Sequence, residues 1–219
     1  EVKRLTGRMV AINLEPATIK NNDEETVWNL TTGRQATVEN ARKAADMGVD
    51  MIVLTGNPGV GVDNEAIMQA LSKLKDAVGD RVILTAGKMH ASGIISEAGE
   101  KILTEKDIVD FIDAGADVIL LPAPGTVPGI TMEYASKLIK KAHEKGALTM
   151  TTIGTSQEGA DEDTIRQIAL MCKMAGADIH HIGDSGYMGM ALPENITAYS
   201  VAIRGKRHTY RRMAMSLLR

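Results

Sequence analysis

The sequence has few of the residue types on which several protein classes depend. It contains a single cysteine, Cys172, which excludes an intrachain disulfide framework and a cysteine-rich zinc site. One Phe, one Trp and four Tyr offer few platforms for stacking on nucleic acid, and 25 Lys and Arg residues are outnumbered by 28 Asp and Glu residues. No apolar run reaches the roughly 18 residues of a membrane-spanning helix. We therefore expect a cytoplasmic protein that binds neither nucleic acid nor membrane.

The chain carries an internal repeat in which a glycine, often as Gly-x-Asp, precedes a short apolar run. The repeat glycines lie 31, 36, 31 and 30 residues apart, at Gly48, Gly79, Gly115, Gly146 and Gly176. This spacing fits a βα unit, which needs a helix, a C-cap glycine, a buried strand and a loop. A sixth apolar run spans residues 9–14, so we predict six parallel strands that alternate with helices.

Residues that cap helix N-termini precede four of the amphipathic segments. They are Asp63, Thr104, Thr131 and Asp161, and Asp107 follows Thr104 at the spacing of a capping box. We predict that helices begin at these positions.

The segments that follow the strands distinguish two α/β folds. A doubly wound nucleotide-binding sheet concentrates its glycines after the first strand, but here that strand ends Asn13-Leu14-Glu15-Pro16. Glycine and polar residues instead follow nearly every strand, which is typical of a (β/α)8 TIM barrel. Six strands are two fewer than that fold requires. We therefore expect a single barrel domain over residues 1–219 that lacks two N-terminal βα units.

Several segments are similar to an uncharacterised bacterial TIM-barrel family, whose members often carry the labels phosphoenolpyruvate phosphonomutase-like or haloacid dehalogenase-like hydrolase. The segments are LTGNPGVGV (54–62), AGKMH (86–90), LLPAPGTVPG (120–129), IGTSQEGADEDTIRQIAL (153–170), HIGDSGY (181–187) and PENITAYSVAIRGKRHTYRRMA (193–214). The resemblance covers nearly the whole chain and implies a TIM barrel that begins about two βα units earlier. The Asp-x-Asp motif of dehalogenases does not follow the first strand here, and Cys172 lies on the apolar face of a predicted helix.

Polar residues at the strand ends would converge on one mouth of the barrel. Alternation places Asn13 and Glu15 on the inner side of the first strand, and Lys88 and His90 end the third. We predict that Glu15 is a general base and Lys88 a clamp on negative charge, with His90 as a proton shuttle. There are two structural alternatives. Glu15 and Lys88 could form a salt bridge with each other, and His90 could be a loop residue with no catalytic role.

His180 and His181 are neighbours on the last strand and must face opposite sides. We expect His181 to face the mouth as a general acid, with His180 packed against helices. Asp184 follows in a Gly-Asp-Ser-Gly turn, where it could orient His181, bind Mg²⁺ together with Glu15, or only cap its own turn.

The strand-end loops also supply hydroxyl, amide and backbone N–H groups that suit a small anion. The predicted ligand-binding residues are Asn13, Asn57, Thr126, Gly154, Thr155, Ser156, Gly183, Ser185 and Gly186. Turn formation explains several of them equally well.

These residues predict a lyase, isomerase or hydrolase that acts on a small carboxylate or phosphorylated metabolite by acid–base or metal-assisted chemistry. Two alternatives stay open: a non-catalytic barrel that binds a metabolite or a partner, and an aldolase that forms a Schiff base through Lys88. A homo-oligomer is a further expectation, because six cations and no acid lie between Arg204 and Arg219 and could form a subunit interface or a solvated helix face.

Overall fold

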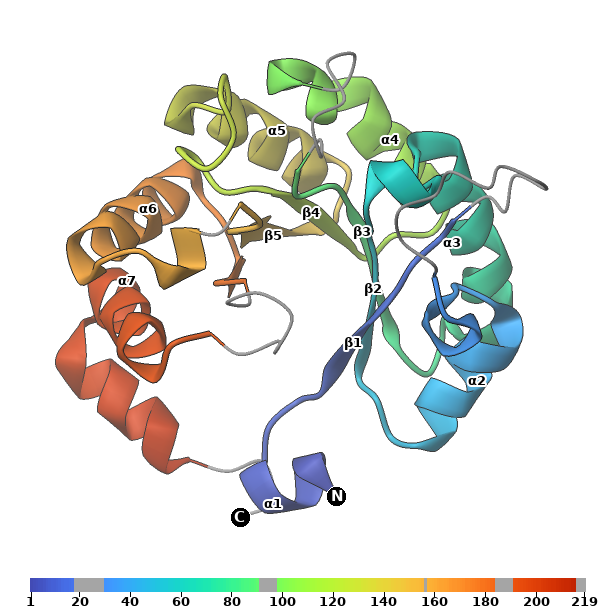
Figure 1. Ribbon diagram of the computed structural model, residues 1–219, viewed down its shortest axis with the longest axis horizontal. Coiled ribbons are helices and arrows are strands. Elements are labelled where there is room, and N and C mark those ends of the chain that lie inside the picture. The colour runs from blue at the N-terminus through green and yellow to red at the C-terminus, as the bar shows by residue number, and fades with distance from the viewer. Residues whose placement is uncertain (18–29, 91–97, 156, 184–190, 216–219) are drawn as a thin grey trace.

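The computed structural model describes residues 1–17, 30–90, 98–155, 157–183 and 191–215. Its centre is a parallel sheet in the order β1-β2-β3-β4-β5-β6. The strands are β1 (Ala11–Leu14), β2 (Met51–Leu54), β3 (Ile83–Gly87), β4 (Val118–Pro122), β5 (Leu148–Thr152) and β6 (Ile179–His181). Helices cover the outside of this curved sheet (Figure 1). The predicted α/β class with six βα units is confirmed, and the sheet forms a curled half-barrel.

Four of the helices begin where the sequence places their caps. The α-helices are α1 (Val2–Thr6), α2 (Val38–Asp46), α3 (Asn64–Val78), α4 (Glu105–Asp113), α5 (Met132–Glu144), α6 (Glu162–Ala175) and α7 (Pro193–Ala214). The side chains of Asp63, Thr104, Thr131 and Asp161 each accept a hydrogen bond from a backbone N–H in the first turn of α3, α4, α5 and α6. Thr104 and Asp107 form the complete capping box. Within the described residues, no helix is long and apolar enough to cross a membrane.

The two faces of the sheet bury different clusters. Ile52 and Leu54 of β2 belong to the main core beneath the helices, whereas Met51 and Val53 belong to a smaller cluster on the inner face. Asn13 pairs in register with Val53, so it lies on the inner face, as alternation predicts.

The aspartate of each Gly-x-Asp step fastens its strand to the preceding one. Asp117 Oδ2 accepts a hydrogen bond from Leu84 N at 2.9 Å, and Asp117 Oδ1 lies 3.0 Å from Lys75 Nζ. Asp50 and Asp178 repeat this arrangement with Val10 N and Lys3, and with Thr149 N and His143. The sequence repeat therefore has a structural cause, which is a charge-assisted hydrogen bond between neighbouring strands.

Replacing Asp117 with Ala should lower the free energy of unfolding by about 1–3 kcal/mol, because Leu84 N loses its charged acceptor in a buried position. Asp113→Ala is the matched control, since the Asp113 side chain is 64% exposed and lies 3.7 Å from Lys145 Nζ. Urea unfolding should show a change within about 0.5 kcal/mol for this control. Equal effects of the two substitutions would contradict the strand-fastening role.

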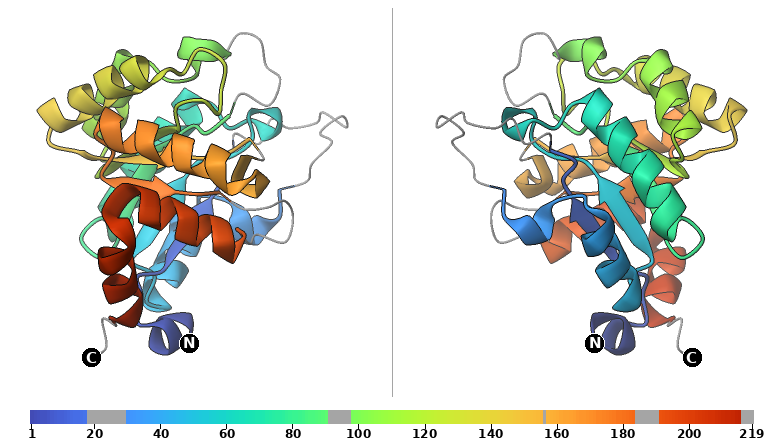
Figure 2. Two further views of the ribbon diagram at one scale, coloured as in Figure 1. Left: turned by 90° about the vertical axis from the view of Figure 1, so that its left-hand side faces the viewer. Right: turned by 90° about the vertical axis from the view of Figure 1, so that its right-hand side faces the viewer.

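The basic segment from residue 204 to residue 212 runs along the outside of the molecule (Figure 1). α7 is interrupted at Gly205, where φ is 76° and ψ is 161°, and its second half approaches α1 (Figures 1 and 2). Arg8 Nη2 donates a hydrogen bond to Met213 O at 3.2 Å. The cations from Arg204 to Arg212 are exposed, which fits a solvated helix face, and a role in oligomers remains a prediction.

Candidate functional site

The parallel register places the carboxyl ends of all six strands at one edge of the half-barrel. Leu14 pairs with Leu54, Leu54 with Ala86, and Gly87 with Leu120, while Thr152 pairs with His181 at the other side of the sheet. Glu15 directly follows β1, Lys88 directly follows β3, and His181 ends β6. These three predicted residues therefore lie at the same edge.

Glu15 is buried at this edge and is only 5% exposed. Its carboxylate accepts a hydrogen bond from the guanidinium of Arg34, which ends the 3-10 helix η1 (Thr32–Arg34). The backbones are also joined, because Glu15 N donates to Arg34 O at 2.7 Å and Ala36 N donates to Glu15 O at 2.9 Å. The carboxylate is therefore fixed by a charged partner that the sequence did not indicate.

Burial raises the pKa of the Glu15 carboxyl group, and the nearby Arg34 guanidinium opposes this effect only in part. The loop after β2 closes the site from the other side. A Cβ at Gly56 would lie 3.0 Å from both Cγ and Oε2 of Glu15, and 2.8 Å from Cγ2 of Val62. A carboxylate whose pKa is raised by burial is a stronger base than an exposed one, which suits proton abstraction.

Asn13 holds the end of β1 against β2. Its Nδ2 donates to Val53 O at 3.1 Å and to Thr55 O at 2.9 Å. Both hydrogens of the amide are thus used by the backbone, and ligand binding by Asn13 remains a prediction.

Lys88 is 4% exposed, although it follows the end of its strand. The next residue, Met89, packs against the inner cluster, and a Cβ at Gly154 would lie 2.8 Å from its Cβ and Cγ. His90 is half-buried, and burial lowers the pKa of its imidazole, which favours the neutral ring at pH 7.

The histidines of β6 face opposite sides, as the sequence predicts. His180 Nδ1 lies 3.0 Å from Tyr199 OH of α7, on the helix side. His181 Nδ1 lies 3.0 Å from Thr152 Oγ1 and accepts a hydrogen bond from Gly183 N at 3.0 Å. Because Nδ1 is an acceptor, the neutral His181 ring carries its proton on Nε2.

Hydroxyl and amide groups of the rim loops form turn hydrogen bonds. Asn57 Oδ1 accepts from Gly59 N at 2.7 Å, and Thr126 Oγ1 donates to Ala123 O at 2.7 Å. Thr155 Oγ1 donates to Thr126 O at 2.9 Å and joins the two loops. The bonds of Asn57 and Thr126 are those expected if these residues serve to form turns, which is the alternative to ligand binding. Ser156, Asp184, Ser185 and Gly186 lie outside the described residues.

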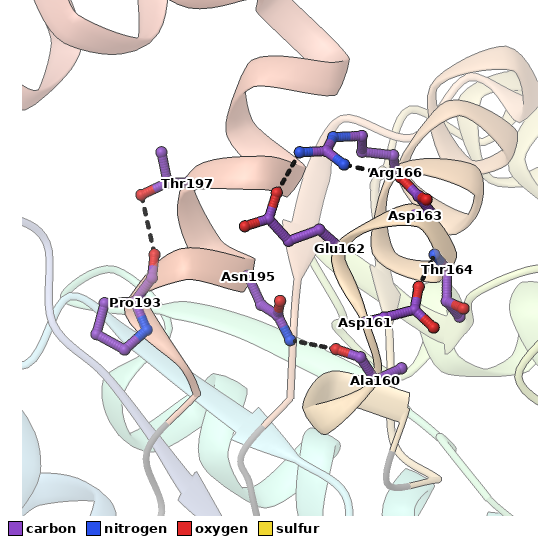
Figure 3. A network of polar contacts seen from close by, with 9 residues as sticks. All are labelled: Ala160, Asp161, Glu162, Asp163, Thr164, Arg166, Pro193, Asn195 and Thr197. Carbon is purple, nitrogen blue, oxygen red and sulfur yellow. Dashed lines mark hydrogen bonds and ion pairs between the residues drawn. The ribbon is translucent and has the colours of Figure 1, made fainter.

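The start of α6 is an acidic surface. Asp161 caps the helix at Thr164 N, and Arg166 pairs with both Glu162 and Asp163 (Figure 3). Asn195 of α7 fastens the preceding loop by donating to Ala160 O at 2.9 Å. A dianion at this helix start would face the three carboxylates, so the geometry disfavours it there.

A cavity of about 730 Å³ lies beside the rim. It is lined by residues 125–133, Gln157, Met171 and Met174, and it includes Thr126 but neither Glu15, Lys88 nor His181. The cavity is therefore separate from the predicted catalytic groups.

Comparison with protein-family models matches residues 1–219 to a family described as "Domain of unknown function (DUF7916)". The chain belongs to the DUF7916 family. Part of the chain is also similar to curated proteins. A Haemophilus influenzae protein named "Putative N-acetylmannosamine-6-phosphate 2-epimerase" is 36% identical over 89 residues, which are 41% of this chain and 33% of that protein. A protein of the same name from Actinobacillus pleuropneumoniae serotype 5b is 35% identical over 88 residues, or 40% and 33% of the two chains. The matched segment thus spans about a third of these curated relatives.

Solved structures show the same fold. The deoxyribose phosphate aldolase from Aeropyrum pernix has a TM-score of 0.59 at 17% identity, covering 93% of the DUF7916 chain and 74% of its own. A "putative lyase/mutase" from Burkholderia cenocepacia has a TM-score of 0.58 at 17% identity, covering 93% and 69%. These matches support the barrel class. The phosphonomutase-like and dehalogenase-like labels are not confirmed by them.

The Mg²⁺ site predicted for the DUF7916 chain remains a prediction. In the described ranges, no three His, Cys, Asp or Glu side chains gather as metal ligands. Glu15 is paired with Arg34, and the second predicted ligand, Asp184, lies outside those ranges.

Sequence reasoning missed Arg34 and Asn195 of the DUF7916 chain. Arg34 lies 19 residues from Glu15, and the two meet because Glu15 pairs with Gln35 in a parallel bridge outside the main strands. The segment Thr-Thr-Gly-Arg-Gln carries no periodic pattern that would reveal this contact. The one signal at Asn195 is a polar side chain in the first turn of a helix, which does not indicate that it binds the loop before α6.

Proposed function

We propose that this DUF7916 protein is a TIM-barrel lyase or isomerase that acts on a small anionic metabolite by acid–base chemistry. The observation that carries this proposal is the buried carboxylate of Glu15, with a raised pKa, at the carboxyl edge of the strands. The partial similarity to epimerases named for N-acetylmannosamine 6-phosphate supports a phosphorylated sugar as the substrate class. A small metabolite with a carboxylate group is the alternative substrate.

In the proposed reaction, Glu15 removes a proton from a carbon next to a carbonyl group. The electron pair of the broken C–H bond moves to the carbonyl oxygen, where Lys88 stabilises the negative charge. His181 Nε2–H donates a proton to that oxygen. Protonated Glu15 then gives a proton back to carbon and His181 recovers its proton from the oxygen, which completes an isomerisation or epimerisation. In a cleavage, Glu15 instead removes the proton of a hydroxyl group one carbon further from the carbonyl. That hydroxyl oxygen becomes a new carbonyl as the carbon–carbon bond breaks, and the electron pair of this bond forms the enolate that Lys88 and His181 stabilise.

Deuterium exchange tests this proposal without knowledge of the product. The protein is incubated in D2O with phosphorylated aldoses and ketoses, N-acetylhexosamine 6-phosphates and 2-oxo acids, and proton NMR follows the hydrogen next to each carbonyl. We expect enzyme-dependent exchange in one substrate class. A folded protein that exchanges no member of this panel would contradict the proposal.

The burial of Lys88 favours a second candidate, an aldolase that forms a Schiff base, because a lysine in an enclosed site can act as a nucleophile. Treatment with borohydride in the presence of the exchanged substrate, followed by peptide mass spectrometry, separates the two. The acid–base mechanism predicts no adduct at Lys88. A substrate adduct that Lys88→Met abolishes would replace it with the Schiff-base mechanism.

A further inference from the structure

We propose that Arg34 binds the anionic group of the ligand at the mouth of the half-barrel, an inference that rests on the proposed function for the location of the site. The ligand group is a phosphate or a carboxylate, because both present oxygen pairs that match a guanidinium.

The backbone that carries Arg34 is held from two sides. On the strand side, Glu15 N donates to Arg34 O at 2.7 Å. On the helix side, Asn40 Nδ2 of α2 donates to Thr32 O at 2.8 Å and to Gln35 O at 2.9 Å. A residue whose backbone is fixed before binding loses less conformational entropy when a ligand arrives.

The side chain of Arg34 is fixed at one point and open elsewhere. Its Nη2 donates to the buried Glu15 carboxylate, whose side chain is 6% exposed, whereas the Arg34 side chain is 63% exposed. Within the described part of the chain, Glu15 is the one hydrogen-bond partner of this guanidinium. A guanidinium has five N–H donors, so several remain for an anion in the mouth.

The other cations at this edge are less open to a second anionic group. Lys88 is 4% exposed and is the proposed partner of the reacting carbonyl oxygen, and Arg166, at the start of α6, already pairs with Glu162 and Asp163. Arg34 therefore combines solvent access, a fixed position and closeness to the proposed base. An anion bound to it would place its substrate beside Glu15.

Calorimetric titration with inorganic phosphate, and in a separate arm with acetate, tests the inference on the whole chain. We expect Arg34→Gln to weaken binding of the preferred probe by about 10- to 100-fold, which corresponds to the loss of a charged hydrogen-bonding group. Arg34→Lys should recover part of the affinity, because it keeps the charge but not the planar fork. Loss in the phosphate arm identifies a phosphate group, and loss in the acetate arm identifies a carboxylate.

Arg42→Gln is the matched control, because Arg42 is exposed on α2, eight residues from Arg34 in the sequence. It should bind both probes as the wild type does. Asn40→Ala provides a second test, since it keeps the guanidinium but releases its loop, and it should weaken the same probe by a smaller factor. Circular dichroism and thermal unfolding establish that each variant is folded.

Unchanged probe affinity in Arg34→Gln would overturn the inference, as would a wild type that binds neither probe. Failure of the proposed function gives a different result. Suppose that the wild type catalyses no exchange, but binds phosphate or acetate and the Arg34→Gln variant binds it more weakly. The proposed anion site is then supported and the proposed acid–base function is contradicted. With an exchange assay in hand, Arg34→Gln should raise KM more than it lowers kcat, which a merely structural role would not do.

Discussion

Replacing Glu15 with Gln should lower the rate of substrate exchange by about 10²–10⁴-fold, the usual contribution of a general base. Gln has nearly the same shape, so it can stay between Gly56 and Arg34, but its amide cannot accept a proton under these conditions. The measurement is the initial rate of deuterium exchange at saturating substrate, with Arg42→Gln as the control for substitution in the same region. A rate within tenfold of the wild type would remove Glu15 from the mechanism.

The free energy of unfolding of Glu15→Gln should increase relative to that of the wild type as the pH rises. Burial raises the pKa of Glu15 in the folded protein, so the folded state binds a proton more tightly than the unfolded state does. The wild type therefore loses stability as the pH rises from the unfolded value through the raised folded value, whereas the variant has no carboxyl group at this position and loses none. Urea unfolding should show a difference between Glu15→Gln and wild type that favours the variant more at pH 7 than at pH 4. A difference that moves the other way would contradict the raised pKa.

Replacing Gly87 with Ala should prevent stable folding, with a loss of about 4 kcal/mol or more. Gly87 ends β3 with φ at 156°, and a Cβ there would lie 1.8 Å from Leu120 O and 2.7 Å from Leu120 C on the neighbouring strand. The contact is with backbone, so no side-chain rotation relieves it, and β3 and β4 would have to separate. A loss of this size is a large part of the roughly 5–15 kcal/mol that typically stabilises a domain.

Gly48→Ala is the control that separates the strain of a positive φ from the clash with a neighbouring strand. Gly48 has φ at 87°, but a Cβ there would meet no atom within 4 Å. We expect this control to lose only about 1–2 kcal/mol, the usual strain of a left-handed residue. Soluble yield and urea unfolding should separate the two variants clearly. Equal losses would show that the approach of Leu120 is unimportant.

The fold could be predicted because its signals are local. The capping box of Thr104 and Asp107 lies within one helical turn, and the glycine spacing sets the length of each βα unit. The parallel order then follows, because strands that alternate with helices cannot form hairpins. The faces of His180 and His181 followed from the two-residue period of a strand.

The details of the candidate site depend on contacts that the sequence does not encode locally. The pairing of Glu15 with Arg34 requires a bridge to Gln35 from a segment without periodicity. The burial of Lys88 depends on how residues beyond the regular strand pack. Thr126 is ambiguous for another reason, since a short hydroxyl side chain bonds readily to backbone two or three residues away, and the same group could equally bind a ligand.

Burial prepares Glu15 as a base and Arg34 limits that effect, and ¹³C NMR of the Glu15 carboxyl carbon during a pH titration tests both effects most directly. We predict a titration midpoint above the ordinary value of 4.5 in the wild type, and a still higher midpoint in Arg34→Gln. A midpoint at or below 4.5 in the wild type, or one that falls when Arg34 is removed, would contradict the account.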